Sequence, residues 1–187
     1  SPGLSGTSLP TIRTRADGVT WNRTMPAVHR SGLTAIRAGR SIETSMGMTP
    51  TEGLVMGTRC GWVDPAVPLY VMEREGQNTD EMDLLLNKKS GLLGITGRFY
   101  DRRDILKNAE AGDERCRLAL EVEARSLKKT IGAYAACMGG LDAVVFTAGV
   151  GENGPQMRER ICRGLEVLGA RIDPSVNDFK GKQRDIS

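Results

Sequence analysis

The stretch from Asp142 to Gly169 constrains the fold of this 187-residue chain most strongly. It opens with a short apolar run, Ala143 to Phe146, whose length is typical of a buried β-strand. A glycine-rich turn at Gly149–Gly154 follows, and Pro155 suits the first position of a helix, where its missing N–H is not needed. Apolar residues then recur at helical spacing as far as Gly169, a residue that commonly ends helices. The pattern predicts a strand, a glycine loop and a helix within an α/β fold.

An arrangement of this kind can hold an anion. Backbone N–H groups and the helix dipole attract phosphate at the start of a helix, and glycine lets a ligand approach the backbone closely. The alternative is an ordinary connection between a strand and a helix, because short glycine motifs also occur in proteins that bind no nucleotide. Taken alone, the segment leaves both interpretations open.

Composition excludes several classes of protein. The chain is 39% hydrophobic and 26% charged, as globular proteins are, and its 4% aromatic content argues against a nucleic-acid stacking surface. No apolar run approaches the roughly 20 residues that span a bilayer, so we expect neither a nucleic-acid nor a membrane partner. The single histidine and four scattered cysteines form no metal or disulfide pattern, which favours a reducing compartment such as the cytoplasm. The cysteines are Cys60, Cys116, Cys137 and Cys162.

The first 40 residues differ from the rest in charge. They contain six arginines and one aspartate, whereas the remaining 20 basic and 22 acidic side chains nearly balance. Residues 1–30 are also rich in Ser, Thr and Pro and show no periodicity. Such a segment can be a transit peptide, a basic arm that binds nucleic acid, or an irregular remnant of a larger domain. The chain begins at Ser1 without a methionine, and we interpret residues 1–32 as a remnant.

Between residues 33 and 104, turn signals divide the chain. Leu33–Arg37 and Ser41–Ser45 read as a β-hairpin around Ala38-Gly39. Met46–Pro65 is too dense in glycine and proline to form one regular element, and Ser90–Asp104 is likewise broken by glycine.

Three helices are predicted around these breaks. The first starts at Asp64-Pro65 and ends at Gly76, and the second runs to Lys88 from an Asn78 cap, with Glu81 placed for a capping box. The third is long, starts after Asp113 and ends at Gly139-Gly140. Its apolar stripe consists of Leu120, Ala124, Leu127, Ile131, Tyr134 and Met138. The stripe is most simply a core face, and a dimer seam is the alternative.

Three long motifs, taken together in this order and spacing, resemble the acetate kinase family of carboxylate kinases. They read S-I-E-T-S-M-G-M-T-P-T-E-G-L-V-M-G-T-R-C-G-W-V-D-P, then L-L-N-K-K-S-G-L-L-G-I-T-G with D-R-R-D-I-L, then I-G-A-Y-A-A-C-M-G-G-L-D-A-V-V-F-T-A-G-V-G-E-N-G-P. The resemblance extends from about Leu33 to Ser187. Three separate long motifs are far more specific than one glycine loop.

The resemblance implies an actin-like ATPase (ribonuclease H-like) α/β fold, with a mixed sheet, flanking helices and a nucleotide cleft between two similar domains. Residues 33–187 would form the C-terminal nucleotide-binding domain, truncated at its end. The implied reaction is reversible phosphoryl transfer from ATP to acetate, which gives acetyl phosphate and ADP and uses Mg²⁺. Propionate is the alternative acceptor. A homodimer is also implied, formed through this domain.

The resemblance also implies roles for individual residues. Arg59, in G-T-R-C-G, matches an arginine that stabilises the transition state, a role suited to a guanidinium fork facing phosphoryl oxygens. The implied nucleotide contacts are Gly149, Val150, Gly151, Glu152 and Asn153 in one segment, and Asp101, Arg102 and Arg103 in a second. The alternatives are a surface Arg59 paired with Asp64, and a local ion pair between Asp101 and Arg103.

The chain departs from the family pattern at several positions. His29 and Gly32 only partly match the phosphate loop H-L-G-N-G, Trp62 stands where an acidic residue is expected, and Arg102 replaces an apolar residue. Ser5 and Leu9 replace two histidines. The family's catalytic aspartate has no counterpart, and its magnesium-binding glutamate is expected beyond Ser187, so no metal site is predicted within this chain. We therefore expect no turnover by the chain alone, and the alternative function is a non-catalytic scaffold that binds nucleotide or dimerises.

Overall fold

The computed structural model describes residues 11–13, 25–29, 32–178 and 186. The chain forms two compact units. The first contains the described residues up to Thr44 together with those from Leu127 onward, and the second is Ser45–Ser126. The predicted division at residue 32 stays a prediction.

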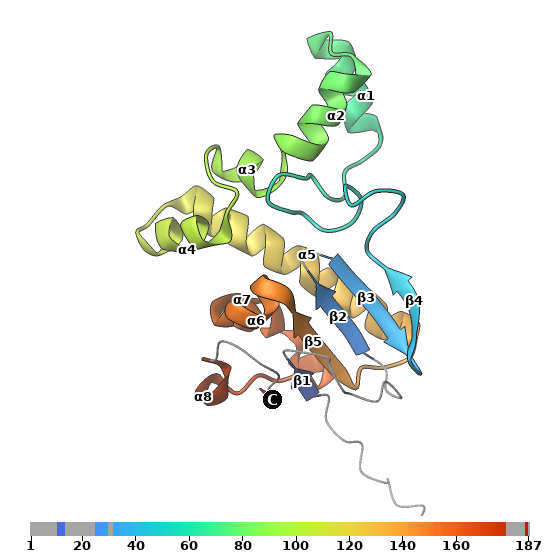
Figure 1. Ribbon diagram of the computed structural model, residues 1–187, viewed down its shortest axis with the longest axis vertical. Coiled ribbons are helices and arrows are strands. Elements are labelled where there is room, and N and C mark those ends of the chain that lie inside the picture. Colours follow the sequence, from blue (N-terminus) through green and yellow to red (C-terminus); the bar gives the residue numbers. More distant parts are fainter. Residues whose placement is uncertain (1–10, 14–24, 30–31, 179–185, 187) are drawn as a thin grey trace, which may run out of the picture. The chain divides into compact units, whose positions relative to one another are not determined.

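A five-stranded mixed sheet lies in the first unit (Figure 1). The strands are β1 Thr11–Arg13, β2 Met25–His29, β3 Gly32–Arg37, β4 Arg40–Thr44 and β5 Ala143–Thr147, in the order β1-β5-β2-β3-β4. β1 and β2 run parallel to β5, whereas β3 and β4 are antiparallel neighbours. The predicted mixed sheet is confirmed. The irregular structure predicted for residues 1–32 is wrong at β1 and β2, because pairing with the distant β5 supplies hydrogen bonds that the local sequence pattern does not reveal.

The predicted β-hairpin is confirmed. Arg37 pairs with Arg40, and the two residues between them, Ala38 and Gly39, have φ angles of 49° and 76°. Positive φ at both positions is the geometry of the tight turn that best matches the twist of paired strands.

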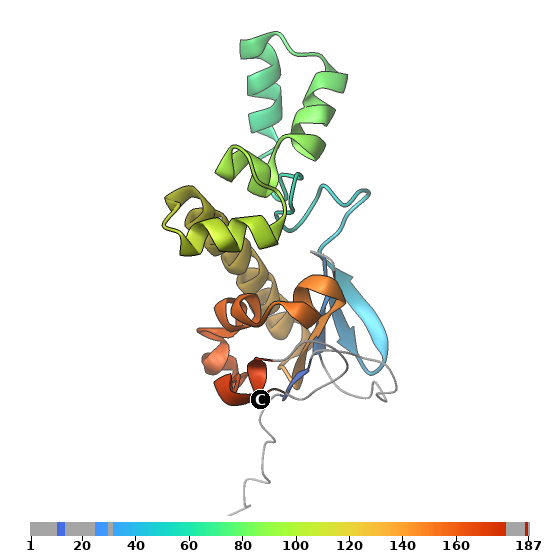
Figure 2. The ribbon, with the colours of Figure 1, turned by 60° about the vertical axis from the view of Figure 1, so that its left-hand side comes forward.

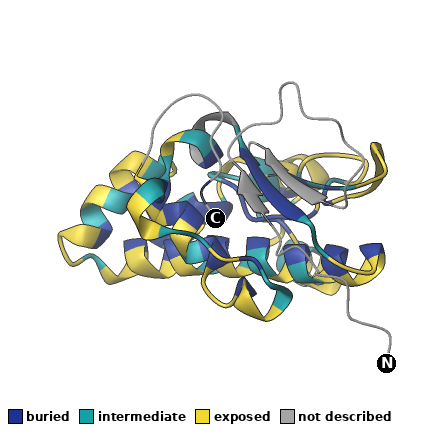
Figure 3. Ribbon diagram, turned by 90° about the horizontal axis from the view of Figure 1, so that it is seen from below, coloured by how far each residue is buried: buried dark blue, intermediate teal, exposed yellow. Residues whose placement is uncertain are grey.

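Strand β5 and helix α5, Glu114–Met138, supply much of the core of the first unit. Ala143 to Phe146 are at most 3% exposed, so both faces of this central strand are covered, and the second half of α5 runs behind the strands (Figure 1). All six residues of the predicted apolar stripe are buried, and buried and exposed positions alternate around the helix (Figure 3). The stripe is therefore a core face. Asp113 caps α5 as predicted, accepting a hydrogen bond from the Cys116 N–H at 3.0 Å.

The second unit contains four helices and the first part of α5. Helices α1 Ala66–Glu75 and α2 Thr79–Lys88 lie side by side (Figure 2). Gly76 ends α1 at a φ of 66°, and Asn78 and Glu81 form the predicted capping box of α2. The remaining helices are α3 Gly91–Thr96 and α4 Arg102–Glu110. The interrupted structure predicted for Ser90–Asp104 is therefore partly wrong, because Gly91 and Gly97 lie at the two ends of α3.

Among the described residues after β5, the chain forms four short helices: α6 Ala148–Asn153, α7 Pro155–Cys162, the 3₁₀ helix η1 Leu165–Leu168 and α8 Pro174–Asn177. Pro155 begins a helix as predicted. The predicted glycine loop is wrong, because residues 148–153 form a helical turn instead. The predicted continuous helix up to Gly169 is also wrong, because Gly164 adopts a left-handed φ of 92° and separates α7 from η1. No helix among the described residues is long and apolar enough to cross a bilayer.

Candidate functional site

Arg59 lies in the irregular segment before α1, and its backbone is fixed by hydrogen bonds. The Met56 N–H donates to the Arg59 carbonyl at 3.1 Å, and the Ser90 N–H donates to the Thr58 carbonyl at 3.1 Å. The Leu92 N–H in α3 donates to the Met56 carbonyl at 2.9 Å. The start of α3 therefore determines where the Arg59 loop runs.

Gly91 makes this close contact possible. Its φ is +62°, and a Cβ atom there would lie 2.1 Å from the Met56 carbonyl oxygen and 2.6 Å from that of Arg59. Only glycine combines the left-handed backbone with so little space.

The Arg59 guanidinium retains unused hydrogen-bonding capacity. The side chain is half-buried, and its Nη1 atom donates to the Met56 Sδ atom at 3.9 Å. Its Nε atom is buried and has no hydrogen-bond partner among the described residues. Asp64 instead accepts from the Ala66 N–H at 2.9 Å, and the described part of the chain shows no Arg59–Asp64 pair. A buried donor without an acceptor costs about 1–3 kcal/mol, so this guanidinium is suited to receive an anion.

Asp101 and Arg103 form the local ion pair that was the alternative to nucleotide contact. Asp101 caps α4 by accepting from the Arg103 N–H at 2.9 Å, and its carboxylate also accepts from Arg103 Nε at 3.0 Å and Nη2 at 2.6 Å. These bonds from Arg103 lower the pKa of Asp101 to about 2. The Arg103 side chain is 89% exposed, and exposed pairs contribute little to stability. A ligand can therefore replace this pair at small cost.

Arg102 points away from that pair and binds the buried Glu123 of α5. Its Nε atom lies 2.7 Å from both carboxylate oxygens, and its Nη2 atom donates to one of them. The Glu123 side chain is 1% exposed and that of Arg102 is 18% exposed. The role predicted for Arg102 at the nucleotide stays a prediction, while the structure shows it holding α4 against α5. Sequence reasoning missed Glu123, whose one signal is a carboxylate directly before the stripe residue Ala124.

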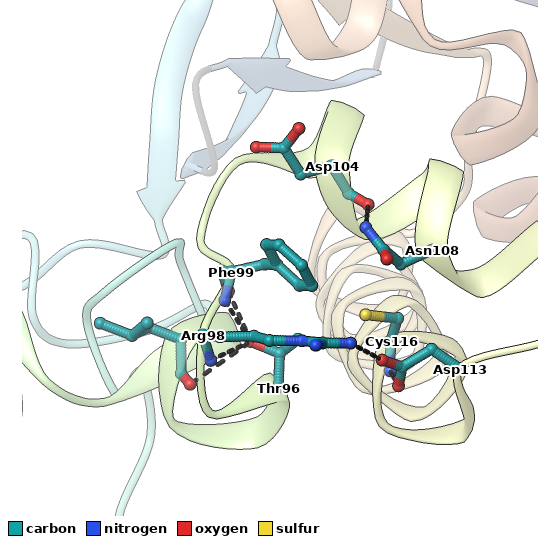
Figure 4. Close-up of polar contacts among 8 residues, drawn as sticks. Thr96, Arg98, Phe99, Asp104, Asn108, Asp113 and Cys116 are labelled. Atoms are coloured by element: carbon teal, nitrogen blue, oxygen red, sulfur yellow. Dashed lines mark hydrogen bonds and ion pairs between the residues drawn. The ribbon is translucent and has the colours of Figure 1, made fainter. Parts of the chain in front are cut away.

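The turn that carries Asp101 is fixed by its own contacts (Figure 4). The Thr96 hydroxyl accepts from the Phe99 N–H at 2.9 Å and donates to the Phe99 carbonyl at 2.6 Å. The Arg98 guanidinium lies 4.7 Å from the Phe99 ring centroid and donates to Asp113 at 2.7 Å. The turn is thus attached to the start of α5.

The Arg59 loop and this turn meet within the second unit. A Cβ atom at Gly57 would lie 3.1 Å from the Tyr100 carbonyl oxygen, immediately before Asp101. Two of the motifs that carry the predicted site are therefore neighbours, although more than 40 residues separate Gly57 from Tyr100.

The segment Gly149–Asn153 forms α6 at the carboxyl end of β5. In the register of the parallel pair, His29 at the end of β2 lies beside Thr147 at the end of β5, and His29 also pairs with Gly32. Helix α6 contacts both β2 and β5. The structure thus brings the predicted phosphate-loop residues His29 and Gly32 close to the predicted nucleotide segment, at the carboxyl ends of β2 and β5. Ligands of α/β sheets commonly bind at the carboxyl ends of the strands.

Arg158 is a buried cation that sequence reasoning did not single out. It lies on α7 with 0% exposure, and its Nη1 atom donates to the carbonyls of Gly151 at 2.7 Å and Glu152 at 3.1 Å. Burial lowers the pKa of this guanidinium from its usual high value. On its other side Gly151 approaches β5 closely, because a Cβ atom there would lie 3.0 Å from Phe146 backbone and side-chain atoms.

Cysteine and metal chemistry have no structural support among the described residues. All four cysteines are free. Burial is the main cause that raises the pKa of Cys60, of Cys116 and of Cys162, the last to about 12. No group of three or more His, Cys, Asp or Glu side chains in the described part of the chain could hold a metal ion.

Comparison with known proteins identifies close relatives. The sequence profile of the Acetokinase family matches residues 29–187. The acetate kinase of Geobacter metallireducens is 59% identical over 143 residues, which cover 76% of this chain and 34% of that protein. The acetate kinase of Methanosarcina thermophila is 52% identical over 157 residues, which cover 84% of this chain and 38% of that protein.

Solved structures agree with this result. The acetate kinase of Porphyromonas gingivalis matches with a TM-score of 0.85 at 42% identity, covering 89% of this chain and 43% of that one. A propionate kinase from Francisella tularensis matches with a TM-score of 0.78 at 40% identity, covering 83% of this chain and 40% of that one. This chain therefore spans between a third and a half of the length of the relatives it matches.

Proposed function

Since this chain belongs to the acetokinase family and has its actin-like ATPase fold, we propose that it supplies the nucleotide-binding part of a kinase acting on a small carboxylate. The reaction is reversible phosphoryl transfer from ATP to acetate, which gives acetyl phosphate and ADP. The chain's own contribution is to bind the nucleotide and to place Arg59 at the transferred phosphoryl group.

The arrangement at the carboxyl ends of β2 and β5 carries this proposal. His29 and Thr147 end neighbouring parallel strands, and α6 follows Thr147 directly. His29 and Gly32, which the family pattern associates with phosphate, therefore lie near the nucleotide segment Gly149–Asn153. We assign this end of the sheet as the binding site for the nucleotide phosphates.

Arg59 supplies the cation that phosphoryl transfer needs. Charge spreads over the equatorial oxygens of the transferred group, and the protein contributes mainly positioning and electrostatic stabilisation. The braced backbone around Arg59 provides the positioning, and its buried Nε, without an acceptor among the described residues, provides the donor. Asp101 and Arg103, exposed at the start of α4, are proposed to face the adenosine once their mutual ion pair opens.

The family relationship also suggests Mg²⁺, which neutralises phosphate charge in such transfers. No group of three or more His, Cys, Asp or Glu side chains in the described part of the chain could hold this ion, and we assign no metal ligand among these residues. Acetate is the proposed acceptor because the matched curated relatives are acetate kinases, and the similarity to a propionate kinase structure supports propionate as the second candidate.

We also propose that the protein is cytoplasmic, since its four cysteines are free thiols, which suits a reducing compartment. We further propose that it forms a homodimer. The support for the dimer is helix α1, which has no buried residue and exposes Val67, Leu69 and Tyr70 at 47%, 67% and 57%. A second copy would cover this apolar surface. Sedimentation velocity of Leu69→Asp beside the parent tests the assembly, and a parent chain that stays monomeric at high concentration contradicts it.

Nucleotide titration tests the proposed function. We expect the 187-residue chain to bind ADP and ATP in isothermal titration calorimetry. Arg59→Met should weaken ATP binding about tenfold or more and leave ADP binding within about twofold, because the guanidinium would face only the γ-phosphoryl group. Arg125→Met, an exposed change on α5 in the same unit, is the matched control. A cooperatively folded chain that binds neither nucleotide would refute the proposal.

Turnover is a separate question for this chain. Because it spans less than half the length of its relatives, we expect no Mg²⁺-dependent acetyl phosphate when hydroxylamine traps the product. Binding without turnover is also what a non-catalytic scaffold would show. A robust trapped signal would contradict this expectation and support a complete active site.

A further inference from the structure

We propose that Arg158 is the positioning residue of the nucleotide segment: its buried guanidinium fixes the peptide groups of Gly151 and Glu152 in the orientation that nucleotide binding requires. This inference rests on the proposed function, since it concerns the same binding site at the carboxyl ends of β2 and β5. It adds Arg158 of α7, a residue that the sequence motifs for nucleotide binding did not include.

The hydrogen bonds of Arg158 connect two segments of the chain. Its Nη1 atom donates to the carbonyls of Gly151 at 2.7 Å and Glu152 at 3.1 Å. Its Nε atom donates to Asn177 Oδ1 at 2.9 Å, and its Nη2 atom donates to the Asn177 carbonyl at 2.5 Å. One guanidinium therefore links the end of α6 to the end of α8.

Asn177 strengthens the arrangement from the other side. It is 5% exposed, and its Nδ2 atom donates to the Pro155 carbonyl at 3.0 Å in the first turn of α7. The buried Asn177 side chain therefore connects the Arg158 guanidinium to the start of α7. A planar, five-donor fork suits such a multiple contact, whereas the single ammonium of lysine does not.

Planarity of the peptide bond converts these contacts into control of the segment. The Gly151 carbonyl belongs to the same rigid plane as the Glu152 N–H, and the Glu152 carbonyl shares a plane with the Asn153 N–H. Holding both carbonyls fixes both planes. On the opposite side Gly151 packs against Phe146 of β5. A Cβ atom at Gly151 would lie only 3.0 Å from Phe146 atoms, so the position has no room for a side chain. The segment is therefore clamped between the strand and the guanidinium.

This clamp explains why a helix with two glycines keeps its shape. Glycine is less favourable than alanine inside helices, and α6 has only six residues. Without Arg158 the segment would sample other conformations, and nucleotide binding would then have to select the competent one. Loss of Arg158 should therefore appear as weaker affinity, without any contact between Arg158 and the nucleotide.

The test compares Arg158→Lys with Arg163→Lys in the full chain. Arg163 follows α7, is 73% exposed and pairs only with Glu159 among the described residues, so it is a matched control. We expect R158K to raise the ADP dissociation constant about tenfold or more, and R163K to leave it within about twofold. The measurement is calorimetric titration with ADP, performed well below the melting temperature of each variant and corrected for the folded fraction.

Amide hydrogen exchange supplies a readout that lost stability alone would not move. In the nucleotide-free chain, R158K should speed exchange in the peptide covering residues 148–153 more than in β5 or α5. An R158K chain that melts cooperatively, binds ADP like the parent and keeps slow exchange there would overturn the inference alone. Failure of the parent chain itself to bind ADP would overturn the proposed function, and this inference with it.

A second variant keeps the test decisive if R158K does not fold. Asn177→Ala removes one acceptor of the guanidinium and the bond to Pro155 but leaves the contacts to Gly151 and Glu152. We expect a smaller rise in the ADP dissociation constant, about threefold. An unchanged constant in this variant, with unchanged exchange at residues 148–153, would also overturn the inference.

Discussion

The pair formed by Arg102 and Glu123 offers the sharpest prediction about stability. Glu123 is almost completely buried, and Arg102 stands where the family pattern has an apolar residue. Replacing Arg102 with methionine removes the cation but leaves a carboxylate inside the protein. A buried charge without its partner typically costs about 3–5 kcal/mol.

Burial on both sides of the pair sets the magnitude. The Glu123 side chain is 1% exposed and that of Arg102 is 18% exposed, so water can replace little of the lost cation. We therefore expect R102M to lose about 3–4 kcal/mol of unfolding free energy at pH 7.

Urea unfolding followed by circular dichroism at pH 7 measures this loss directly, with the parent chain under the same conditions as the reference.

A double variant separates the pair from simple loss of packing. Replacing a buried ion pair by apolar groups is often neutral or stabilising, so Arg102→Met with Glu123→Leu should lie within about 1 kcal/mol of the parent. Arg125→Met, an exposed change on α5, the helix that carries Glu123, is the control for the loss of an arginine. The reasoning fails if R102M costs under about 1 kcal/mol, or if the double variant is as unstable as the sum of its single changes.

Three further predictions concern single positions. Ala38→Asn should stabilise the chain by about 0.5–1 kcal/mol in urea unfolding, because asparagine tolerates the φ of 49° at this turn better than alanine; a loss of stability would contradict this. Gly91→Ala should lower the unfolding free energy by at least about 2 kcal/mol, since its Cβ atom would meet the Met56 and Arg59 carbonyl oxygens. The molecules that still fold should bind ATP more weakly. Thermal melting that matches the parent would refute the close contact. The Asp101 carboxylate, with its pKa lowered to about 2, contributes stability that is present above about pH 4 and lost as pH falls towards 2, so Asp101→Asn should flatten acid unfolding in that window, and an unchanged acid profile would show that the ion pair does not form.

Elements set by local chemistry could be predicted from the sequence. Asn78 with Glu81 satisfies the free N–H groups of a helix start whatever lies around it, and Gly76 takes a left-handed φ of 66° that few other residues adopt. The hairpin at Ala38-Gly39 belongs to the same class. In each case a few adjacent residues supply both partners of the interaction.

Elements set by distant partners could not be predicted in this way. β1 and β2 form strands because the backbone of β5, more than 110 residues later in the chain, pairs with both of them. Helix α6 reads as a loop because its glycines disfavour a helix, and the contacts of Gly151 with Phe146 and Arg158 are invisible in sequence. Arg158 itself looks like a surface residue, since an arginine between Met157 and Ile161 is ordinary in an amphipathic helix.

The D-R-R segment shows why a matched motif locates a site better than it assigns roles within it. Successive residues at the start of a helix point about 100° apart, so adjacent arginines cannot face the same way. One of them, Arg102, turns to the buried Glu123, and the other, Arg103, stays at the surface with Asp101. The sequence alone could not decide which arginine is committed to the protein, because the answer depends on a carboxylate 21 residues away in α5. If either arginine contacts the nucleotide, geometry favours Arg103, since recruiting Arg102 would leave the Glu123 charge buried without its cation.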